Sequence, residues 1–303
     1  MRMGVLDIGS NTGHLLIVDA FAGGPPVPTH SFKEPLRLAE HLDADENISR
    51  QGIDALVGFV RRAQVEAREQ GCATTLSFAT SAVRDAANSE TLLGEVRAAT
   101  GVDLHVVSGE DEARLTFLAV RRWFGWSSGR LGVFDIGGGS LELAAGLDEA
   151  PEVAVTLPLG AGRVTRTWFD AGRTTDELRS HVRGEIAEHA GRILRHGRFY
   201  HAVATSKTFR SLARMCGAAP SGDGPYVRRA LARGDAKDLV KRLEPMSLAE
   251  IAKLPGVSTD RAHQMRAGAV IAEAVMDLFH LEELEICPWA LREGILLDHL
   301  DRL

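Results

Sequence analysis

The chain has 303 residues, of which 45% are hydrophobic and 25% are charged, and its formal net charge at pH 7 is −6. This composition excludes a disordered chain, a collagen and a coiled coil, and the length suits two domains that each bury a core. The mild acidity and an aromatic content of 6% argue against general DNA or RNA binding, so the sequence predicts no nucleic-acid partner. Local cations would have to hold any polyanion.

The cysteines and the first residues favour a cytoplasmic protein. Cys72, Cys216 and Cys287 are odd in number and far apart, which indicates neither a disulfide framework nor a zinc site. Asp7 stands where a signal peptide needs its apolar core, and no apolar run approaches the ~18 residues of a membrane span. We therefore expect no export and no membrane partner.

The first part of the chain alternates strands and helices, as expected for α/β construction. Apolar periodicity and turn residues predict strands around 5–8, 14–18, 74–79 and 103–107, and helices over 47–70 and about 89–99. Gly71 is placed to end the first helix, and Ser108 is placed to cap a third one. The Gly/Ser-containing stretch 125–129 is interpreted as a linker.

The second part repeats this alternation. Strands are predicted over 131–134, 141–145, 153–157 and 201–204, and helices over about 175–195 and 206–215. A Gly/Pro/Ser loop at 219–225 is followed by helices over much of 235–280, by a last strand at 284–286 and by a terminal helix from Leu291.

A weak internal repeat links the two parts. The run Val-Leu-Asp-Ile-Gly-Ser at 5–10 returns as Val-Phe-Asp-Ile-Gly-Gly-Gly-Ser at 133–140, and a second apolar run follows each copy. Each copy predicts a strand, a Gly-rich turn and another strand. Two similarly built domains, each with one acidic loop, are the simplest interpretation.

The glycines after Asp135 carry the strongest chemical signal. Consecutive glycines let the backbone turn tightly and present N–H groups to an anion, while the aspartate can hold a divalent cation. This loop could cradle a phosphate beside Mg²⁺. A plain hairpin turn is the alternative, and the matching turn at Ser10 weakens that alternative.

Two further features could act on a phosphate. Glu110, Asp111 and Glu112 begin a helix, where the dipole favours acids for structural reasons alone, but a carboxylate there could also deprotonate a water. Arg84 follows a strand directly and could clamp a phosphate with its planar set of donors, or it could be a solvated surface residue.

Three cations form a set near a helix start. Lys207, Arg210 and Arg214 are spaced by three and four residues, which puts them on one helical face as an anion-binding row or a solvated basic surface. Residues 160–163 (Gly-Ala-Gly-Arg) follow another strand and are interpreted as a plain turn or a further backbone contact. No GxxxxGK[ST] or GxGxxG motif supports a P-loop or Rossmann site.

Several of these segments together resemble a known family. In order and spacing, residues 7–11, 79–84 with Asn88, 108–113 and 135–142 are similar to the exopolyphosphatase/guanosine pentaphosphate phosphohydrolase family, and 291–296 looks like its closing motif. The resemblance implies two actin-like α/β domains of the ribonuclease H-like, sugar kinase/actin superfamily, facing each other across an interdomain cleft. We expect domains at 1–126 and 127–289, with a terminal helix at about 290–303 packing back on the first.

The same resemblance implies roles for individual residues. Glu112 matches the catalytic glutamate that activates water, with Arg84 beside it, and Asp135, Glu142 and Asp7 are the expected magnesium ligands. Glu110 becomes the secondary candidate for the glutamate that activates water. The expected phosphate-binding residues, with the cation row included for the following phosphates, are Ser10, Asn11, Gly138, Gly139, Ser140, Lys207, Arg210 and Arg214.

These observations predict a Mg²⁺-dependent exopolyphosphatase that removes terminal phosphate from linear polyphosphate, with a preference for short chains. One alternative is a guanosine pentaphosphate 5′-phosphohydrolase, which would use the same acids. Another is an ATP-binding actin-like module or small-molecule kinase, but residues 204–209 lack the Gly-rich loop that an adenosine would need. A homodimer is expected only as the commonest assembly of such proteins.

Overall fold

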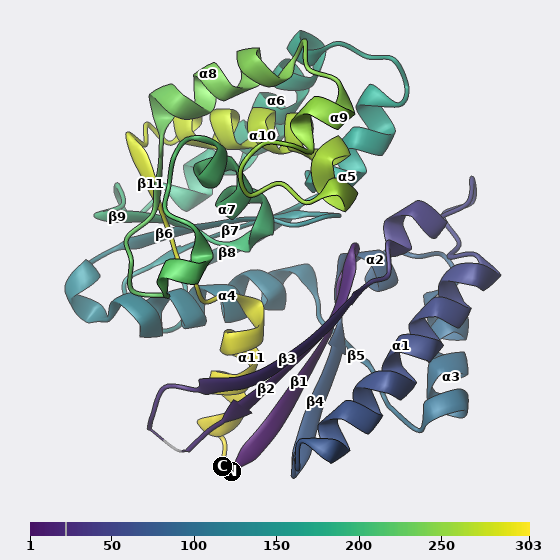
Figure 1. Cartoon of the computed structure of the whole chain (residues 1–303). Coiled ribbons are helices and arrows are strands. Elements are labelled where there is room, and N and C mark those ends of the chain that lie inside the picture. The colour runs from purple at the N-terminus through teal and green to yellow at the C-terminus, as the bar shows by residue number, and fades with distance from the viewer. Residues whose placement is uncertain (22) are drawn as a thin grey trace. The chain divides into compact units, whose positions relative to one another are not determined.

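The computed structural model describes residues 1–21 and 23–303, which form two compact units (Figure 1). Unit 1 comprises Met1–Glu112 and Leu291–Leu303, and unit 2 comprises Ala113–Ala290. The division therefore falls inside helix α4 (Gly109–Phe124), whereas the sequence interpretation ended the first domain at residue 126. No helix among the described residues is long and apolar enough to span a membrane.

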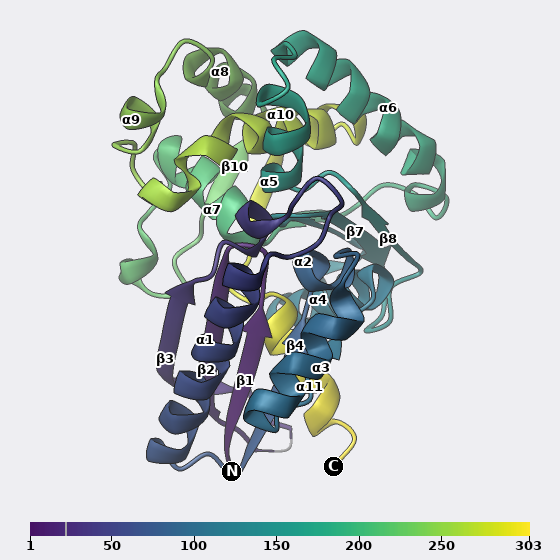
Figure 2. The same ribbon diagram turned by 90° about the vertical axis from the view of Figure 1, so that its right-hand side faces the viewer.

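Unit 1 is built on a five-stranded mixed sheet in the order β3-β2-β1-β4-β5. Strand β1 pairs antiparallel with β2 and parallel with β4. Figures 1 and 2 show α1 and α3 on one face of this sheet and α11 on the other. The elements are β1 (Arg2–Ile8), β2 (Thr12–Asp19), β3 (Val27–Pro35), the 3₁₀ turn η1 (Leu38–His41), α1 (Arg50–Glu69), β4 (Thr74–Ala79), α2 (Ser81–Arg84), α3 (Ser89–Thr100), β5 (His105–Val106) and α11 (Leu291–Leu300).

Helix α1 forms for the reasons that its sequence suggested. Ser49 caps it by accepting a hydrogen bond from the Gly52 N–H at 3.4 Å, and its buried stripe includes Leu56 and Val60. Gly71 follows the helix with φ = 73°, a left-handed conformation that favours glycine. The predicted helix and its C-terminal glycine are confirmed.

Strand β3 was not predicted, because its sequence lacks the alternation of apolar and polar residues that is typical of a strand. It lies at the edge of the sheet beside β2, and all of its residues are at least partly exposed, so no apolar alternation marks it. Pro28 and Pro35 stand within it, which an edge strand tolerates and a central strand does not.

Unit 2 contains a six-stranded mixed sheet in the order β10-β11-β9-β6-β7-β8. Helices α6, α7 and α8 surround α10 over one face (Figure 1). Besides the C-terminal part of α4, its elements are η2 (Trp126–Ser128), β6 (Leu131–Ile136), β7 (Leu141–Gly146), β8 (Val153–Leu157), α5 (Ala161–Val164), the π-helical turn η3 (Thr165–Phe169), α6 (Thr175–Ile193), β9 (His201–Ala204), α7 (Ser206–Met215), η4 (Ser221–Asp223), β10 (Ala230–Ala232), α8 (Arg233–Leu243), α9 (Leu248–Ile251), η5 (Thr259–Gln264), α10 (Met265–Leu278) and β11 (Glu283–Ile286).

The unit 2 sheet has a core on each face. On one side, Phe134 and Ile136 join α10 residues such as Ile271 in a large buried cluster. On the other side, Phe117 of α4 packs with Val133 of β6. Because neighbouring residues of a strand point to opposite faces, β6 is apolar along nearly its whole length, as a strand covered on both sides must be.

The two units repeat one topology, which confirms the two similarly built halves inferred from the sequence. In unit 1 the hairpin β1-β2 has β4 parallel to its first strand, and in unit 2 the hairpin β6-β7 has β9 in the same place. The tripeptide Ala-Thr-Ser occupies the same place in both units: its alanine ends β4 or β9, and its serine begins α2 or α7, at 79–81 and at 204–206. The repeat therefore includes a second shared sequence besides the two turns.

A fully buried arginine in α4 holds the loops at one end of the unit 2 sheet. The Arg121 side chain has an exposed fraction of 0%, and its guanidinium donates five hydrogen bonds at 2.8–3.3 Å. The acceptors are the carbonyl oxygens of Gly125, Gly129, Gly146 and Asp148 and the hydroxyl oxygen of Ser128.

We expect Arg121→Met to lower the free energy of unfolding by about 3 kcal/mol, because several buried acceptors lose their donor at once. The neighbouring Arg122 pairs with Glu149 at a partly exposed position, so Arg122→Met should cost at most about 1 kcal/mol. Urea denaturation of both variants measures the difference. Equal effects of the two substitutions would contradict this role of Arg121.

Candidate functional site

The first turn (residues 9–12) lies at the carboxyl end of β1. The Gly9 N–H donates to the carbonyl oxygen of Thr12 at 3.1 Å, which closes the hairpin. Ser10 and Asn11 are buried, and the Ser10 hydroxyl is hydrogen-bonded to the hydroxyl of Ser81, the first residue of α2, at 3.1 Å. The predicted phosphate-binding residue Ser10 is therefore held by the segment that also carries Arg84.

The structure brings the two predicted catalytic residues together in unit 1. Arg84 Nη1 donates to Glu112 Oε2 at 3.0 Å and to the carbonyl oxygen of Val107 at 3.1 Å. The exposed fractions of the Arg84 and Glu112 side chains are 19% and 15%. Burial lowers the pKa of Arg84, but the charges and hydrogen bonds of Glu112 and Asp85 together outweigh it and raise this pKa above the usual value. Arg84 is therefore a fixed positive charge beside Glu112.

The three acids at the start of α4 differ in their surroundings. Ser108 caps the helix as predicted, because its hydroxyl accepts from the Asp111 N–H at 3.0 Å and donates to Asp111 Oδ2 at 2.8 Å. Asp111 and Glu110 are exposed, while Glu112 is half-buried. Asp111 thus serves the helix cap, and Glu112 is the acid that the fold holds against an arginine.

The second turn (residues 137–140) repeats the first one at the end of β6. Its Gly137 N–H donates to the carbonyl oxygen of Ser140 at 2.9 Å, as Gly9 does to Thr12. Gly139 and Ser140 are buried, and Gly138 is half-buried. The repeat thus extends from strand order to the hydrogen bond that closes each turn.

Two carboxylates flank the second turn. Asp135 and Glu142 stand directly opposite each other in the β6–β7 pairing, so their side chains share one face of the sheet. Asp135 accepts a hydrogen bond from the Thr205 hydroxyl, and Glu142, which is 3% exposed, accepts one from the Thr156 hydroxyl at 3.0 Å.

This pair fits a magnesium ion, which is commonly held by one or two carboxylates together with waters and substrate phosphates. Within residues 1–21 and 23–303, no three His, Cys, Asp or Glu side chains gather closely enough to hold a metal by themselves. The chemistry of the donor set therefore suits an ion that also takes ligands from a phosphate.

Asp7 occupies the position in unit 1 that Asp135 occupies in unit 2, but its neighbours differ. Its partner across the β1–β2 pairing is His14, where unit 2 has an acid. Arg292 Nη1 lies 3.7 Å from Asp7 Oδ2 and hydrogen-bonds His14 Nδ1. Asp7 already has a cation beside it, and its part in a metal site stays a prediction.

The predicted cation row lies on α7, with two of its members near the start of the helix and the third near its end. The Lys207 ammonium donates to the carbonyl oxygen of Gly256 at 3.4 Å, and Arg210 Nε donates to that of Ser206 at 3.1 Å. Arg214 donates to the carbonyl oxygen of Ala218 at the far end of the helix, about 12 Å from its start at a rise of 1.5 Å per residue. Lys207 and Arg210 are the two members near the helix N-terminus.

Arg261, on η5, is a further cation that the sequence interpretation missed. Burial lowers the pKa of Arg261; Asp260 and Asp135 oppose this effect, and Arg210 adds to it. Arg261 thus lies within electrostatic range of Arg210 and of Asp135. No motif surrounds Arg261, so the sequence offered no signal for it.

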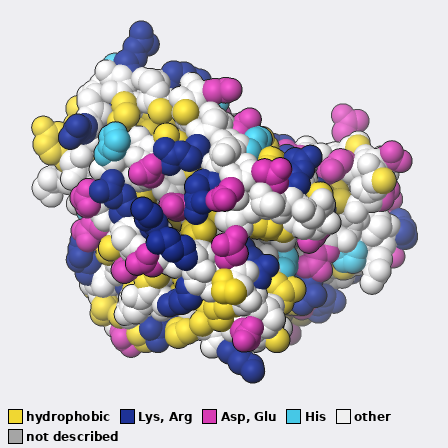
Figure 3. Space-filling view, turned by 90° about the horizontal axis from the view of Figure 1, so that it is seen from above, with side chains coloured by type: hydrophobic (Ala, Val, Ile, Leu, Met, Phe, Trp, Pro, Cys, Tyr) yellow, Lys and Arg dark blue, Asp and Glu magenta, His cyan; other side chains and the backbone are white. Residues whose placement is uncertain are grey.

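The molecule presents no broad basic surface on the face seen from above in Figure 3. Lys and Arg side chains are interspersed there with Asp and Glu side chains. Such a surface does not supply the single-sign field of a general nucleic-acid binder.

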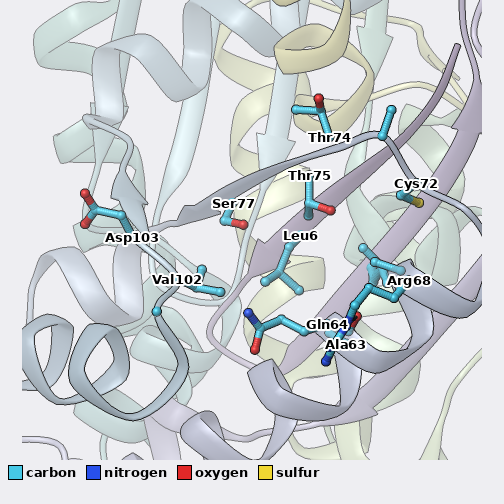
Figure 4. A pocket seen from close by; sticks show the side chains of 14 residues that line it. Leu6, Ala63, Gln64, Arg68, Cys72, Thr74, Thr75, Ser77, Val102 and Asp103 are labelled. Carbon is cyan, nitrogen blue, oxygen red and sulfur yellow. Dashed lines mark hydrogen bonds between the residues drawn. The ribbon is translucent and has the colours of Figure 1, made fainter.

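The pocket shown in Figure 4 is separate from these residues. It has a volume of about 390 Å³ and lies between α1, β4 and the residues that follow α3. Thr74 and Thr75 line it and pair with Met3 and Gly4, so it sits at the end of the sheet opposite the first turn. Cys72 also lines it.

The three cysteines are free thiols, as the sequence predicted. Burial raises the pKa of Cys72, and it raises the pKa of Cys216 to about 11. A thiol with so high a pKa is protonated at neutral pH and is a poor nucleophile. The candidate chemistry therefore rests on carboxylates, arginines and backbone N–H groups.

Two α/β units with one repeated topology, each with a Gly/Ser turn at the end of its first strand, define a protein of the actin-like fold class. The chain belongs to the Ppx/GppA phosphatase family, whose family model matches residues 16–303. The predicted family and the predicted fold class are confirmed.

Known proteins of similar sequence and structure agree with this assignment. The chain is 53% identical to exopolyphosphatase 1 of Mycobacterium tuberculosis over 99% of its length and 89% of that protein, and 51% identical to exopolyphosphatase 1 of Mycobacterium leprae over 99% and 90%. It also matches the crystal structure of an exopolyphosphatase from Cytophaga hutchinsonii with a TM-score of 0.88 at 22% identity, covering 100% of this chain and 99% of that one. A Ppx/GppA family member from Aquifex aeolicus gives a TM-score of 0.81 at 22% identity, with coverage of 100% and 98%.

Proposed function

We propose that this protein is an exopolyphosphatase that hydrolyses the terminal phosphate of linear inorganic polyphosphate. The observation that carries the proposal is the half-buried Arg84–Glu112 ion pair, built in the same unit as a phosphate-type Gly/Ser turn. The two mycobacterial relatives that bear the name exopolyphosphatase 1 support it.

Glu112 is the general base in this proposal. Its carboxylate takes a proton from a water whose oxygen attacks the terminal phosphorus, and the bond from that phosphorus to the bridging oxygen breaks. The products are inorganic phosphate and a polyphosphate shorter by one unit. Arg84 holds Glu112 in place and places a positive charge beside the transferred group.

The turns bind the terminal phosphate. Backbone N–H groups of Gly138, Gly139 and Ser140 in the second turn, with Ser10 and Asn11 in the first, donate to its oxygens. Phosphoryl transfer leaves a protein little covalent chemistry to do, so catalysis rests on positioning and on donors aimed at developing charge.

Asp135 and Glu142 would hold Mg²⁺, and Asp7 is the third residue proposed for this set. When bound, the ion supplies positive charge that neutralises the phosphate oxygens. The proposed role of Asp7 has to be reconciled with its ion pair with Arg292, so it is tested separately from that of Asp135.

The cations of unit 2 bind the phosphates behind the terminal one. Lys207, Arg210 and Arg214 were predicted for this role, and Arg261 joins them because it lies within electrostatic range of Arg210. Arg214 lies farthest from the helix start, and so it would contact only the more distant phosphates. A short row of cations is the basis for proposing a preference for short chains.

Guanosine pentaphosphate remains the alternative substrate, since the same acids would hydrolyse its 5′-terminal phosphate. Nothing in the described residues favours it over polyphosphate. The interdomain cleft, the homodimer and the cytoplasmic location inferred from the sequence also stay predictions.

Phosphate release from polyphosphates of defined length and from guanosine pentaphosphate, each with Mg²⁺ and with EDTA, tests the proposal. We expect faster release from short polyphosphate than from the nucleotide, and loss of release in EDTA. ATP binding without phosphate release from polyphosphate would instead support a nucleotide-binding module.

A further inference from the structure

Residues 160–163, here called the backing segment, pack against the second turn from behind. The Ala161 N–H donates to the carbonyl oxygen of Gly137 at 3.0 Å, and the Arg163 N–H donates to that of Gly138 at 2.9 Å. Two consecutive carbonyl groups of the turn are thereby fixed toward the backing segment.

The orientation of these carbonyls determines where the next N–H groups point. In a trans peptide the C=O of one residue and the N–H of the next are directed oppositely, and every peptide bond among the described residues is trans. The N–H groups of Gly138 and Gly139 are therefore directed away from the backing segment. Within residues 1–21 and 23–303, neither N–H donates to a backbone carbonyl. They are available to an anion.

Position 160 has to be a glycine because its backbone lies against the backbone of the second turn. A Cβ on Gly160 would lie 2.2 Å from the Gly139 carbonyl carbon and 2.3 Å from the Ser140 nitrogen, which are backbone atoms that no rotamer change can move. Its φ of −72° is open to any residue, so backbone conformation does not explain the glycine. The close approach of the two backbones explains it.

Gly162 shows a milder form of the same constraint. A Cβ there would lie 3.0 Å from the Gly138 carbonyl oxygen and 3.0 Å from Nε2 of Gln264, whose side chain is buried. Both glycines of the backing segment thus face the turn, which a plain surface turn would not require.

Unit 1 has a related construction after its own third strand. The Ala39 N–H donates to the Ser10 carbonyl oxygen at 3.2 Å, and the Leu36 and Arg37 N–H groups donate to that of Asn11 at 3.0 Å. Arg37 adopts φ = 49°, a left-handed conformation that is unfavourable for a residue other than glycine. The contacts around Arg37, which include its hydrogen bond to Asn11, have to compensate for this cost. A segment after the third strand thus anchors the turn in both units, but it fixes the carbonyls of the second and third turn residues in unit 1 and those of the first and second in unit 2.

We propose that the backing segment is a positioning element: it fixes the peptide groups of the second turn so that the N–H groups of Gly138 and Gly139 are the donors to the terminal phosphate. The identity of the substrate rests on the proposed function, but the orientation of the N–H groups does not.

The test combines binding and turnover. Protein labelled with ¹⁵N-glycine is titrated with inorganic phosphate, and the Gly138 and Gly139 amide signals, assigned with Gly138→Ala and Gly139→Ala, are expected to shift. In Gly160→Ala these shifts should disappear, and kcat on polyphosphate should fall by about 100-fold, the usual cost of misplacing a backbone donor to an oxyanion. The KM for a long chain should change little, because the cations bind its other phosphates.

The matched control is Gly184→Ala in α6, where a Cβ would meet no atom within 4 Å. It should keep both the shifts and kcat. Should Gly160→Ala fail to fold, Gly162→Ala, with its milder contacts, is expected to weaken the shifts and lower kcat together. If Gly160→Ala folds and keeps the wild-type shifts and kcat, the proposal is overturned. If Gly160→Ala does not fold, the same result in Gly162→Ala overturns it.

The two proposals fail in different ways. A wild-type protein whose Gly138 and Gly139 signals shift with phosphate, but which releases none from polyphosphate, would contradict the proposed function and support the positioning role. Phosphate release with no shift of either signal would contradict the positioning role alone.

Discussion

Glu112→Gln should lower kcat for phosphate release from polyphosphate by about 10³-fold, within the range that general bases contribute. The amide nitrogen cannot accept a proton from water, whereas the amide oxygen can still accept the hydrogen bond from Arg84 Nη1. We therefore expect the thermal midpoint and the affinity for polyphosphate to stay near the wild-type values. Steady-state rates at saturating polyphosphate with Mg²⁺, together with a binding isotherm, measure these effects.

Glu110→Gln is the matched control, since Glu110 lies two residues away in the same first turn of α4 and is exposed. Its rate should remain within about twofold of wild type, as expected for an exposed position that contacts no reacting group. Undiminished turnover in Glu112→Gln, or an equal loss in Glu110→Gln, would remove Glu112 from the catalytic role.

The sequence predicted the regular elements where one face of a helix or strand is buried. Helix α1 has a capping serine, an apolar stripe and a terminal glycine, and all three signals act within the segment itself. Strand β3 and the short strand β10 carry no such signal, because β3 buries no side chain and β10 buries only Leu231. Their existence is decided by the rest of the sheet.

In the candidate site, too, residues with a local motif could be predicted, whereas residues placed by distant contacts could not. Glu112 and Arg84 were predicted separately, each from its own motif, and the structure adds that they form an ion pair across 28 residues of chain. Arg261 could not be predicted, and residues 160–163 were interpreted only as a plain turn or a further backbone contact, because the positions of both segments depend on how η5 and α5 pack in three dimensions. Contacts between distant segments carry no signal in a single sequence.

Asp135→Asn should abolish the stabilisation of the protein by Mg²⁺ and lower the rate of phosphate release by about 100-fold or more. Asp135 and Glu142 face each other across the β6–β7 pairing, and like charges in this position repel when no cation lies between them. Arg261, which lies within electrostatic range of Asp135, offsets part of this repulsion, so the metal-free variant should stay within about 1 kcal/mol of the metal-free wild type. The asparagine oxygen can still accept from the Thr205 hydroxyl.

The measurement is thermal unfolding with and without Mg²⁺, since binding to the native state alone adds about 2.7 kcal/mol at 100 times the dissociation constant. Asp7→Asn is the informative comparison, because Asp7 holds the equivalent position in unit 1 but lies beside Arg292. Removing its charge should destabilise the metal-free protein, by about 1 kcal/mol or less, because Asp7 faces a cation and no second carboxylate across the β1–β2 pairing. Loss of the Mg²⁺ effect in both variants would place Asp7 in the metal site. An undiminished Mg²⁺ effect and rate in Asp135→Asn would show that the metal binds elsewhere.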